Sequence, residues 1–260
     1  MNNLFPNQDI GRTILKHTQL PVYITDEFVF YRCICFNDNF YGKTVSELHR
    51  GNLRRATPEN RYSKLFPDKK ISYWADSPET ARAEVKYHNH TNNLLTFWAY
   101  DDATSTFPTI DNDEPLIIID GMESGFHHIL EKIEEGKILT NDEEKTVELI
   151  KKENPDCLAY TSLRNKCGVN FLFFEKGFKK LSIMEVRLRL GDFRGRNSNR
   201  IVCANTCDYS PFLKGYGEYF LPLARVNMNN KYIESQEYKK RSEVYDKSLK
   251  EIRGFYDRNN

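Results

Sequence analysis

The stretch Ile71-Ser-Tyr-Trp-Ala-Asp-Ser-Pro-Glu-Thr-Ala-Arg-Ala-Glu-Val-Lys-Tyr-His88 carries the clearest structural pattern in the chain. Its first residues, Ile71–Trp74, are apolar and aromatic, which is typical of a short strand, and the strand is expected to end at Asp76. Ser77 can cap a helix, and the proline that follows fits the first helical position. The stretch therefore predicts a strand, a tight turn and a helix that carries Glu84 and ends near residues 90–93.

A cation and a hydroxyl lie in comparable settings elsewhere in the chain. Arg32 interrupts the apolar, strand-like run Phe28–Cys35, and Ser162 closes the run from Asp156 just before a second apolar run, Val169–Phe174. An arginine, a carboxylate and a hydroxyl at the edges of apolar strands can hold an anionic cofactor and act on a sugar carbon. This combination indicates an enzyme more than a scaffold.

The order of the expected elements decides the fold class. Strand-like runs are found at Phe28–Cys35, Ile71–Trp74, Leu94–Tyr100, Leu116–Ile119, Cys157–Thr161, Val169–Glu175 and Leu181–Leu190, and helical stretches follow Ser77 and cover Gly125–Gly136 and Asn141–Glu153. Thr140 and Glu143 have the spacing of a capping box. The order lacks a regular βαβ alternation, and no glycine-rich phosphate-binding motif is present. We therefore expect an α+β fold with a mixed central sheet and flanking helices.

The chain divides into three parts by composition. Residues 1–25 are expected to be an irregular to weakly helical extension, because Pro6 and Pro21 interrupt them. Residues 26–230 are expected to form the main domain, with a polar, basic loop over 36–70 and no clear periodicity over 191–230. Residues 231–260 are expected to be a charged helix dotted with tyrosines, which docks on its own domain, on a partner or on a second copy in a homo-oligomer.

Overall charge and hydropathy exclude several classes of protein. The 260 residues include 38 basic and 37 acidic side chains, so the basic excess of a nucleic-acid-binding protein is absent. The longest apolar runs are far shorter than the roughly 20 residues that span a bilayer. The start lacks the basic and hydrophobic regions of a secretory signal, so we expect a cytoplasmic protein. The six cysteines include no C-x2-C pair, so we expect free thiols and no metal site.

Three segments together resemble the RES-domain family, which is named for an arginine, a glutamate and a serine. The first segment resembles the family core at Tyr73, Ala75-Asp76-Ser77-Pro78, Ala81, Glu84, Val85 and His88. Tyr31-Arg32 looks like the arginine strand of the family, and the run that ends at Ser162, followed by Val169–Phe174, looks like its serine segment. The resemblance covers roughly residues 26–190.

The resemblance implies a fold and an activity. It implies an ADP-ribosyltransferase-like fold and an enzyme that consumes NAD without a metal, by hydrolysis or phosphorolysis of the nicotinamide–ribose bond. Many members of the family are toxins paired with an antitoxin protein. Transfer of ADP-ribose to a protein acceptor and a non-catalytic binding module on the same fold are the alternatives. The chain departs from the family by its length, which implies inserts at 101–114 and 121–155.

The three family positions and their neighbours have physical roles in such a reaction. Breaking the nicotinamide–ribose bond builds positive charge at the ribose C1′ carbon, which the carboxylate of Glu84 can stabilise. The pyrophosphate requires cations, and Arg32 with Arg61 or Lys64 can supply them. The family has a Gly-Arg-Trp-like run where this chain has Arg61-Tyr-Ser-Lys64. The sequence therefore does not decide whether Arg61 or Lys64 supplies the second cation.

The remaining candidates have both functional and structural interpretations. Tyr73 can stack on a ring or bond a ribose hydroxyl, and is otherwise a core residue. Ser162 can position the amide or a phosphate, and is otherwise a turn or capping residue. His88 lies one helical turn after Glu84 and can bond the carboxylate or the substrate. Arg32 is otherwise the partner of a buried acid.

Overall fold

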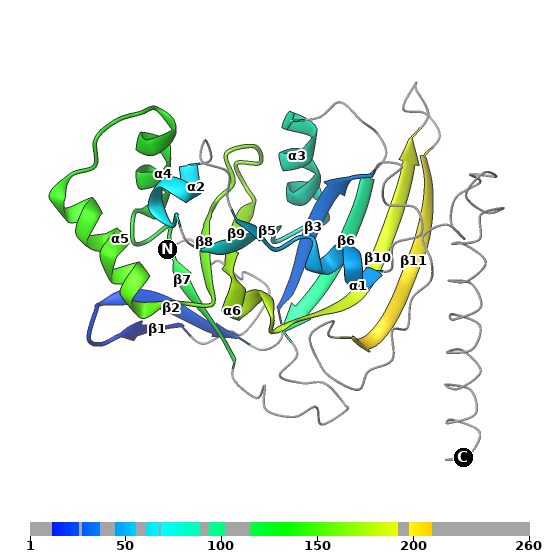
Figure 1. Ribbon diagram of the computed structural model, residues 1–260, viewed down its shortest axis with the longest axis horizontal. Helices are drawn as coiled ribbons and strands as arrows, with labels where there is room; N and C mark the ends of the chain where they lie inside the picture. Colours follow the sequence, from blue (N-terminus) through cyan, green and yellow to red (C-terminus); the bar gives the residue numbers. More distant parts are fainter. Residues whose placement is uncertain are drawn as a thin grey trace, which may run out of the picture.

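The computed structural model describes residues 12–25, 28–36, 45–55, 61–67, 69–88, 94–101, 115–191 and 198–209, and Figure 1 shows their arrangement. They form an α+β fold in which helices flank a large mixed sheet, as the order of elements predicts. In the described part of the chain, every helix is too short or too polar to cross a membrane.

One sheet runs through the whole described structure. Its strands lie in the order β1 (Arg12–Leu15), β2 (Leu20–Thr25), β7 (Leu116–Asp120), β8 (Cys157–Thr161), β9 (Val169–Phe174), β5 (Lys70–Ala75), β3 (Val29–Cys35), β6 (Leu94–Asp101), β10 (Leu181–Gly191) and β11 (Ser198–Tyr209), and the short β4 (Arg54–Arg55) pairs with β5. Strands β7 and β8 are parallel, and the other neighbours are antiparallel. The sheet is therefore mixed.

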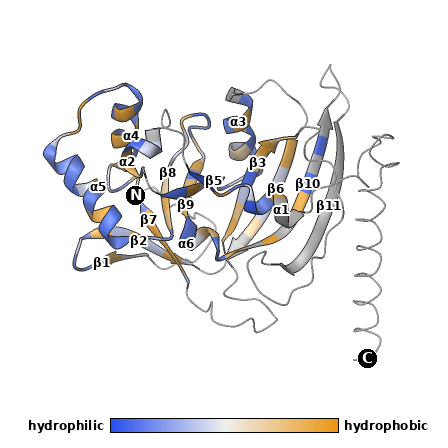
Figure 2. Cartoon of the chain, in the orientation of Figure 1, coloured by the Kyte–Doolittle hydropathy of each residue, from blue (hydrophilic) through white to orange (hydrophobic). Residues whose placement is uncertain are grey.

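Helices cover both faces of this sheet. The helices are α1 (Val45–Arg50), α2 (Arg61–Leu65), α3 (Pro78–His88), α4 (Phe126–Glu134), α5 (Asn141–Glu153) and α6 (Glu175–Phe178). Helices α1 and α6 pack on one face, where Phe30, Phe173 and Phe178 belong to one core cluster. Helices α2, α4 and α5 bury their apolar sides against the opposite face. Figure 2 shows hydrophobic strands inside and a hydrophilic outer surface on α5.

The local signals identified in the sequence explain how several of these elements begin. The Ser77 hydroxyl accepts a hydrogen bond from the Thr80 amide (3.2 Å), which caps α3 as predicted. Thr140 and Glu143 form the predicted capping box at the start of α5. Each of the seven predicted strands is present, with boundaries shifted by a residue or two.

The prediction for the N-terminal extension is wrong from residue 12 onward. Strands β1 and β2 form a hairpin, and β2 joins the central sheet by pairing with β7. Pro21 is tolerated because the ladder with β7 begins only at Val22 and Ile119, so no bond to β7 is required from the proline nitrogen. Gln19 turns the chain between the strands with a positive φ of 59°.

Two other regions contain more structure than predicted. The basic region 36–70 includes the short elements α1, β4 and α2, and the region 191–230 includes β11. The predicted C-terminal helix at 231–260 lies outside the described residues, as does the predicted insert at 101–114 apart from Asp101, which ends β6.

The sheet forks at its centre. Strands β3 and β5 pair only at Tyr31 and Ala75, whereas β3 pairs with β6 at seven positions and β5 pairs with β9 at five. Helix α3 contacts both β3 and β5, and Figure 1 shows it lying over this place. The fork leaves room for side chains between the two strands, and it positions the candidate site.

Candidate active site

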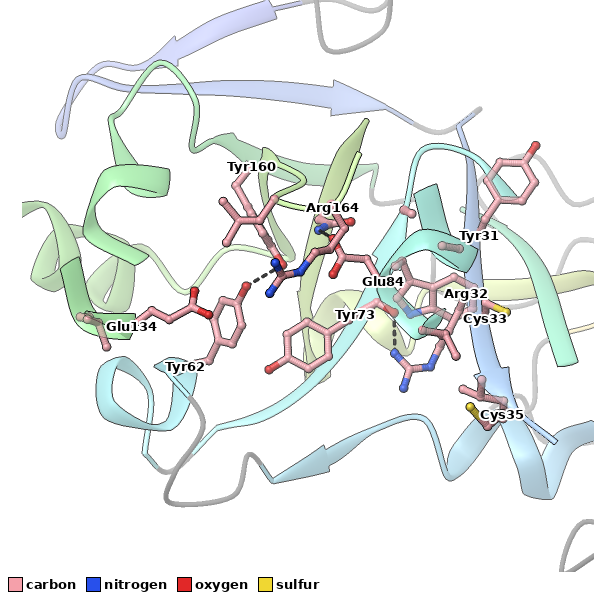
Figure 3. Close-up of a pocket in the computed structure, with 18 of the residues that line it drawn as sticks. Tyr31, Arg32, Cys33, Cys35, Tyr62, Tyr73, Glu84, Glu134, Tyr160 and Arg164 are labelled. Carbon is pink, nitrogen blue, oxygen red and sulfur yellow. Dashed lines mark hydrogen bonds between the residues drawn. The ribbon is translucent and has the colours of Figure 1, made fainter. Parts of the chain in front are cut away.

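A pocket of about 640 Å³ lies at the fork, within the range of about 300–1,000 Å³ that is usual for small-molecule sites. It is lined by residues from α2, α3, α4, β3, β5, β8, β9 and the loop between β8 and β9. Figure 3 shows Arg32, Tyr73 and Glu84 near its middle, with Tyr62 and Glu134 toward one end and Cys35 toward the other. The structure thus brings together Arg32, Tyr73 and Glu84, three residues that the sequence nominated.

The carboxylate of Glu84 is held from one side. Its Oε1 atom accepts hydrogen bonds from the Ser162 hydroxyl (2.6 Å) and from the Asn170 side-chain amide (2.7 Å). Both donors are buried. Within the described chain, no hydrogen bond reaches Oε2 of the same carboxylate. Two donors therefore fix one oxygen, and none of the described residues occupies the other oxygen by a hydrogen bond.

Ser162 uses its whole hydrogen-bonding capacity in this arrangement. A hydroxyl has one hydrogen to donate and two lone pairs to accept with. The hydrogen goes to Glu84, and the lone pairs accept the backbone amides of Arg164 (3.2 Å) and Asn165 (3.1 Å). The hydroxyl thus links the loop between β8 and β9 to the carboxylate on α3.

A second set of contacts ties the same loop to the start of α3. The side-chain amide of Asn165 donates to the Thr80 hydroxyl (2.9 Å), which in turn shares a hydrogen bond with the Ser77 hydroxyl (2.9 Å). Gly168 packs directly against this helix, since a Cβ atom there would lie 2.3 Å from Thr80 Oγ1. The glycine permits the close approach that lets the loop reach Glu84.

Arg32 enters the pocket from β3. Strand alternation places Tyr31 and Cys33 on the α3 side, while Arg32 faces the other side with Ile34. One guanidinium nitrogen donates to the main-chain carbonyl of Tyr73 on β5 (2.5 Å). The guanidinium therefore occupies the fork, where backbone pairing between β3 and β5 ends.

This guanidinium lacks an anionic partner among the residues that the structure describes. Its Nε atom is buried and makes no hydrogen bond there. Burial, together with the nearby positive charge of Arg54, lowers the pKa of Arg32 to about 10, so the side chain is still charged at neutral pH. The alternative that Arg32 pairs with a buried acid has no support in the described residues. A buried, unpaired cation is costly, and an anionic ligand would offset that cost.

Tyrosine rings form a wall of the pocket. Tyr62 donates a hydrogen bond from its hydroxyl to the hydroxyl of Tyr160 (2.6 Å), and its ring lies 5.0 Å from that of Tyr73 between centroids. Flat aromatic surfaces with polar tips suit the stacking of a heteroaromatic ring and hydrogen bonding to its substituents.

Several predicted contributors have side chains outside the described part of the structure. The backbone of Arg61 begins α2 and that of His88 ends α3, but the positions of both side chains lie outside it. Lys64 is exposed and lines the pocket. In the described residues, no group of three side chains is placed to bind a metal. Burial raises the pKa of Cys33 to about 11, which keeps this pocket thiol protonated.

Sequence reasoning missed several polar residues of the pocket, among them Tyr62, Glu134, Tyr160, Arg164 and Asn170. Asn170 had a detectable signal, because it is the one polar residue in the apolar run Val169–Phe174. A buried amide in a strand requires partners, which the carboxylate of Glu84 provides. The others lacked such a signal, since nothing in their immediate sequence distinguishes them from ordinary residues of a helix, a strand or a loop.

Comparisons with known proteins add little to this geometry. No family model matches the chain, and no curated protein matches it. Among solved structures, a chain of the Mycobacterium tuberculosis MbcT–MbcA toxin–antitoxin complex is similar at 12% sequence identity, over 68% of this chain and 87% of that chain, with a TM-score of 0.34. A likeness of this degree does not establish a shared fold.

Proposed function

We propose that the protein cleaves the bond between nicotinamide and ribose in NAD, as a glycohydrolase or phosphorylase on an ADP-ribosyltransferase-like fold. The observation that carries the proposal is the carboxylate of Glu84. Ser162 and Asn170 fix one of its oxygens, and among the described residues neither the other oxygen nor the guanidinium of Arg32 in the same pocket has an oppositely charged or hydrogen-bonding side-chain partner. A fixed carboxylate and a cation in one pocket suit a substrate that develops positive charge on a sugar and carries phosphates.

The reaction requires little acid catalysis. As the C–N bond breaks, its electron pair moves to the ring nitrogen, and nicotinamide leaves as a neutral molecule. The positive charge remains on the ribose C1′ carbon, where a preorganised carboxylate stabilises it. An oxygen of water or phosphate then attacks C1′, and the proton of water, or of the phosphate if it carries one, passes to Glu84 or to solvent. Glu84 is the catalytic residue in this scheme.

The other groups of the pocket suit the rest of the dinucleotide. In this proposal Arg32 contacts the pyrophosphate, because its planar fork allows bidentate contacts to phosphate oxygens. Lys64 and Arg164 line the same pocket and add positive charge. The rings of Tyr62 and Tyr73 offer stacking surfaces for nicotinamide or adenine.

The test is to incubate the purified chain with NAD and to measure nicotinamide by chromatography. Free ADP-ribose as the second product indicates hydrolysis, and its phosphorylated form, seen only when phosphate is added, indicates phosphorolysis. Labelled NAD that becomes attached to protein indicates transfer to an acceptor. Binding of NAD without release of nicotinamide would indicate a non-catalytic binding module and would overturn the proposal.

The resemblance in sequence further leads us to propose a neutralising partner protein of the antitoxin type. Expression of the chain in a bacterial host should deplete cellular NAD and stop growth. Co-expression of the protein encoded next to it should restore both. Growth and NAD levels that are unaffected by the active chain would contradict a toxin role.

A further inference from the structure

We infer that Asn170 is a positioning residue for the carboxylate of Glu84, and that with Ser162 it decides which carboxylate oxygen meets the substrate. The inference rests on the proposed function and deepens it. The side-chain amide of Asn170 donates to Glu84 Oε1 at 2.7 Å, and Asn170 is buried within β9. No sequence motif nominated this residue.

The geometry explains why two donors are needed. A glutamate side chain has three rotatable bonds and turns freely unless its head group is fixed. One donor holds an oxygen at one point but leaves the carboxylate free to turn about that contact. Donors from Ser162 after β8 and Asn170 on β9 reach the same oxygen from two neighbouring strands. Together they hold Oε1, and because none of the described side chains hydrogen-bonds to Oε2, we assign Oε2 as the oxygen that meets the substrate.

The chemistry of the amide suits this position better than a charged donor. Lysine or arginine at the same place would neutralise the carboxylate and weaken its field at C1′. An amide orients the carboxylate and leaves its negative charge intact. An asparagine can also be buried in a strand, provided that a hydrogen bond offsets the free-energy cost of removing its amide from water.

Two substitutions test the inference by different physical routes. Asn170→Ala removes the donor and leaves the carboxylate charged, so kcat for NAD cleavage is expected to fall about 10- to 100-fold with KM nearly unchanged. Asn170→Asp places a second carboxylate against the first, and like charges this close cannot both ionise easily. The acid limb of the pH–rate profile is then expected to move upward by at least about one pH unit.

Other ionisable groups surround the same carboxylate and stay unchanged in these variants. Those that line its pocket are Tyr31, Arg32, Cys33 and Cys35 on β3, Tyr62 and Lys64 on α2, Tyr73 on β5, Glu134 on α4, Tyr160 on β8 and Arg164 in the following loop. Asn165→Ala is the matched control. It breaks a contact between the same loop and α3, to Thr80, without touching Glu84. Its pH–rate profile is expected to keep the wild-type midpoint.

A measurement that does not depend on activity separates this inference from the proposed function. Carbon-13 NMR of glutamate carboxyl groups follows the titration of Glu84 directly, with Glu84→Gln used to assign the signal. In folded Asn170→Asp protein the midpoint is expected to move upward by at least about one pH unit. If the midpoint moves but the wild type does not release nicotinamide, the positioning contact stands and the proposed function fails.

The opposite result overturns the inference alone. Wild-type kcat in folded Asn170→Ala protein, or an unmoved titration in folded Asn170→Asp protein, means that Asn170 does not hold Glu84. Circular dichroism and thermal unfolding establish folding for every variant. If the aspartate variant does not fold, the alanine variant decides by its separate effects on kcat and KM.

Discussion

Replacing Arg32 with methionine tests whether this cation binds the substrate or only stabilises the fold. Burial and the charge of Arg54 lower the pKa of Arg32 from 12.5 to about 10, and at about 1.4 kcal/mol per pKa unit the folded chain bears a cost of about 3 kcal/mol for holding this charge. The hydrogen bond to the Tyr73 carbonyl returns about 1.5–3 kcal/mol. The two nearly cancel, so Arg32→Met is expected to change the free energy of unfolding by less than about 2 kcal/mol.

Activity is expected to respond far more strongly than stability. A charged hydrogen bond to phosphate is worth about 1.5–3 kcal/mol, which corresponds to about a 10- to 100-fold loss of kcat/KM for NAD. Arg32→Lys keeps the charge without the planar fork and should fall between the wild type and Arg32→Met. Arg82→Met is the matched control, because Arg82 pairs with the exposed Glu79 on the surface of α3.

The assay combines urea unfolding with nicotinamide release on the same preparations. Arg82→Met should keep kcat/KM within about threefold of the wild type, because an exposed pair contributes little. The reasoning is refuted if Arg32→Met loses more than about 4 kcal/mol of unfolding free energy while the remaining folded molecules turn over NAD at the wild-type rate. Arg32 would then be a structural residue.

Two further predictions concern the surroundings of the site. Burial and the charges of Arg32 and Arg50 lower the pKa of His49 from 6.5 to about 3. Below pH 6.5 His49 is therefore protonated in the unfolded chain while it stays neutral in the folded chain. The free energy of unfolding is expected to be unaffected by this group above pH 6.5 and to decline by about 1.4 kcal/mol per pH unit below it. The His49 ring stacks on that of Phe178, with 4.5 Å between centroids, and a phenylalanine can keep this contact. Urea unfolding of His49→Phe should therefore show a weaker decline than the wild type, and an equal decline would contradict this. Gly168→Ala should push the loop from Thr80, lowering the unfolding free energy by about 1–3 kcal/mol and slowing NAD cleavage in the same samples; wild-type values for both would show that the loop tolerates the methyl group.

Local signals in the sequence were sufficient for the elements that carry the site. The cap at Ser77 and the proline after it determine where α3 begins, and both act within a few residues. The apolar runs around Arg32 and before Ser162 form the strands expected of them. The mixed sheet followed from the irregular order of strands and helices.

Features that depend on distant partners could not be predicted in this way. Strand β2 contains a proline and lacks a strong pattern, yet it is a strand because β7 pairs with it. The fork, where β3 and β5 pair at one position only, depends on how two strands about forty residues apart meet, which the local pattern of either strand does not encode. Asn170 stands out in the sequence as a polar residue in an apolar run, but its role as the second donor to Glu84 becomes visible only when α3 and β9 are placed together.

The central claim is that the carboxylate of Glu84 drives the cleavage of NAD, and Glu84→Gln tests it most directly. The change is nearly isosteric, so the fold should persist, and Glu79→Gln on the exposed side of the same helix controls for loss of a helical carboxylate. The wild type and Glu79→Gln should release nicotinamide from NAD at similar rates, and folded Glu84→Gln should be slower by about 100- to 1000-fold. Nicotinamide release at the wild-type rate by folded Glu84→Gln protein would contradict the account.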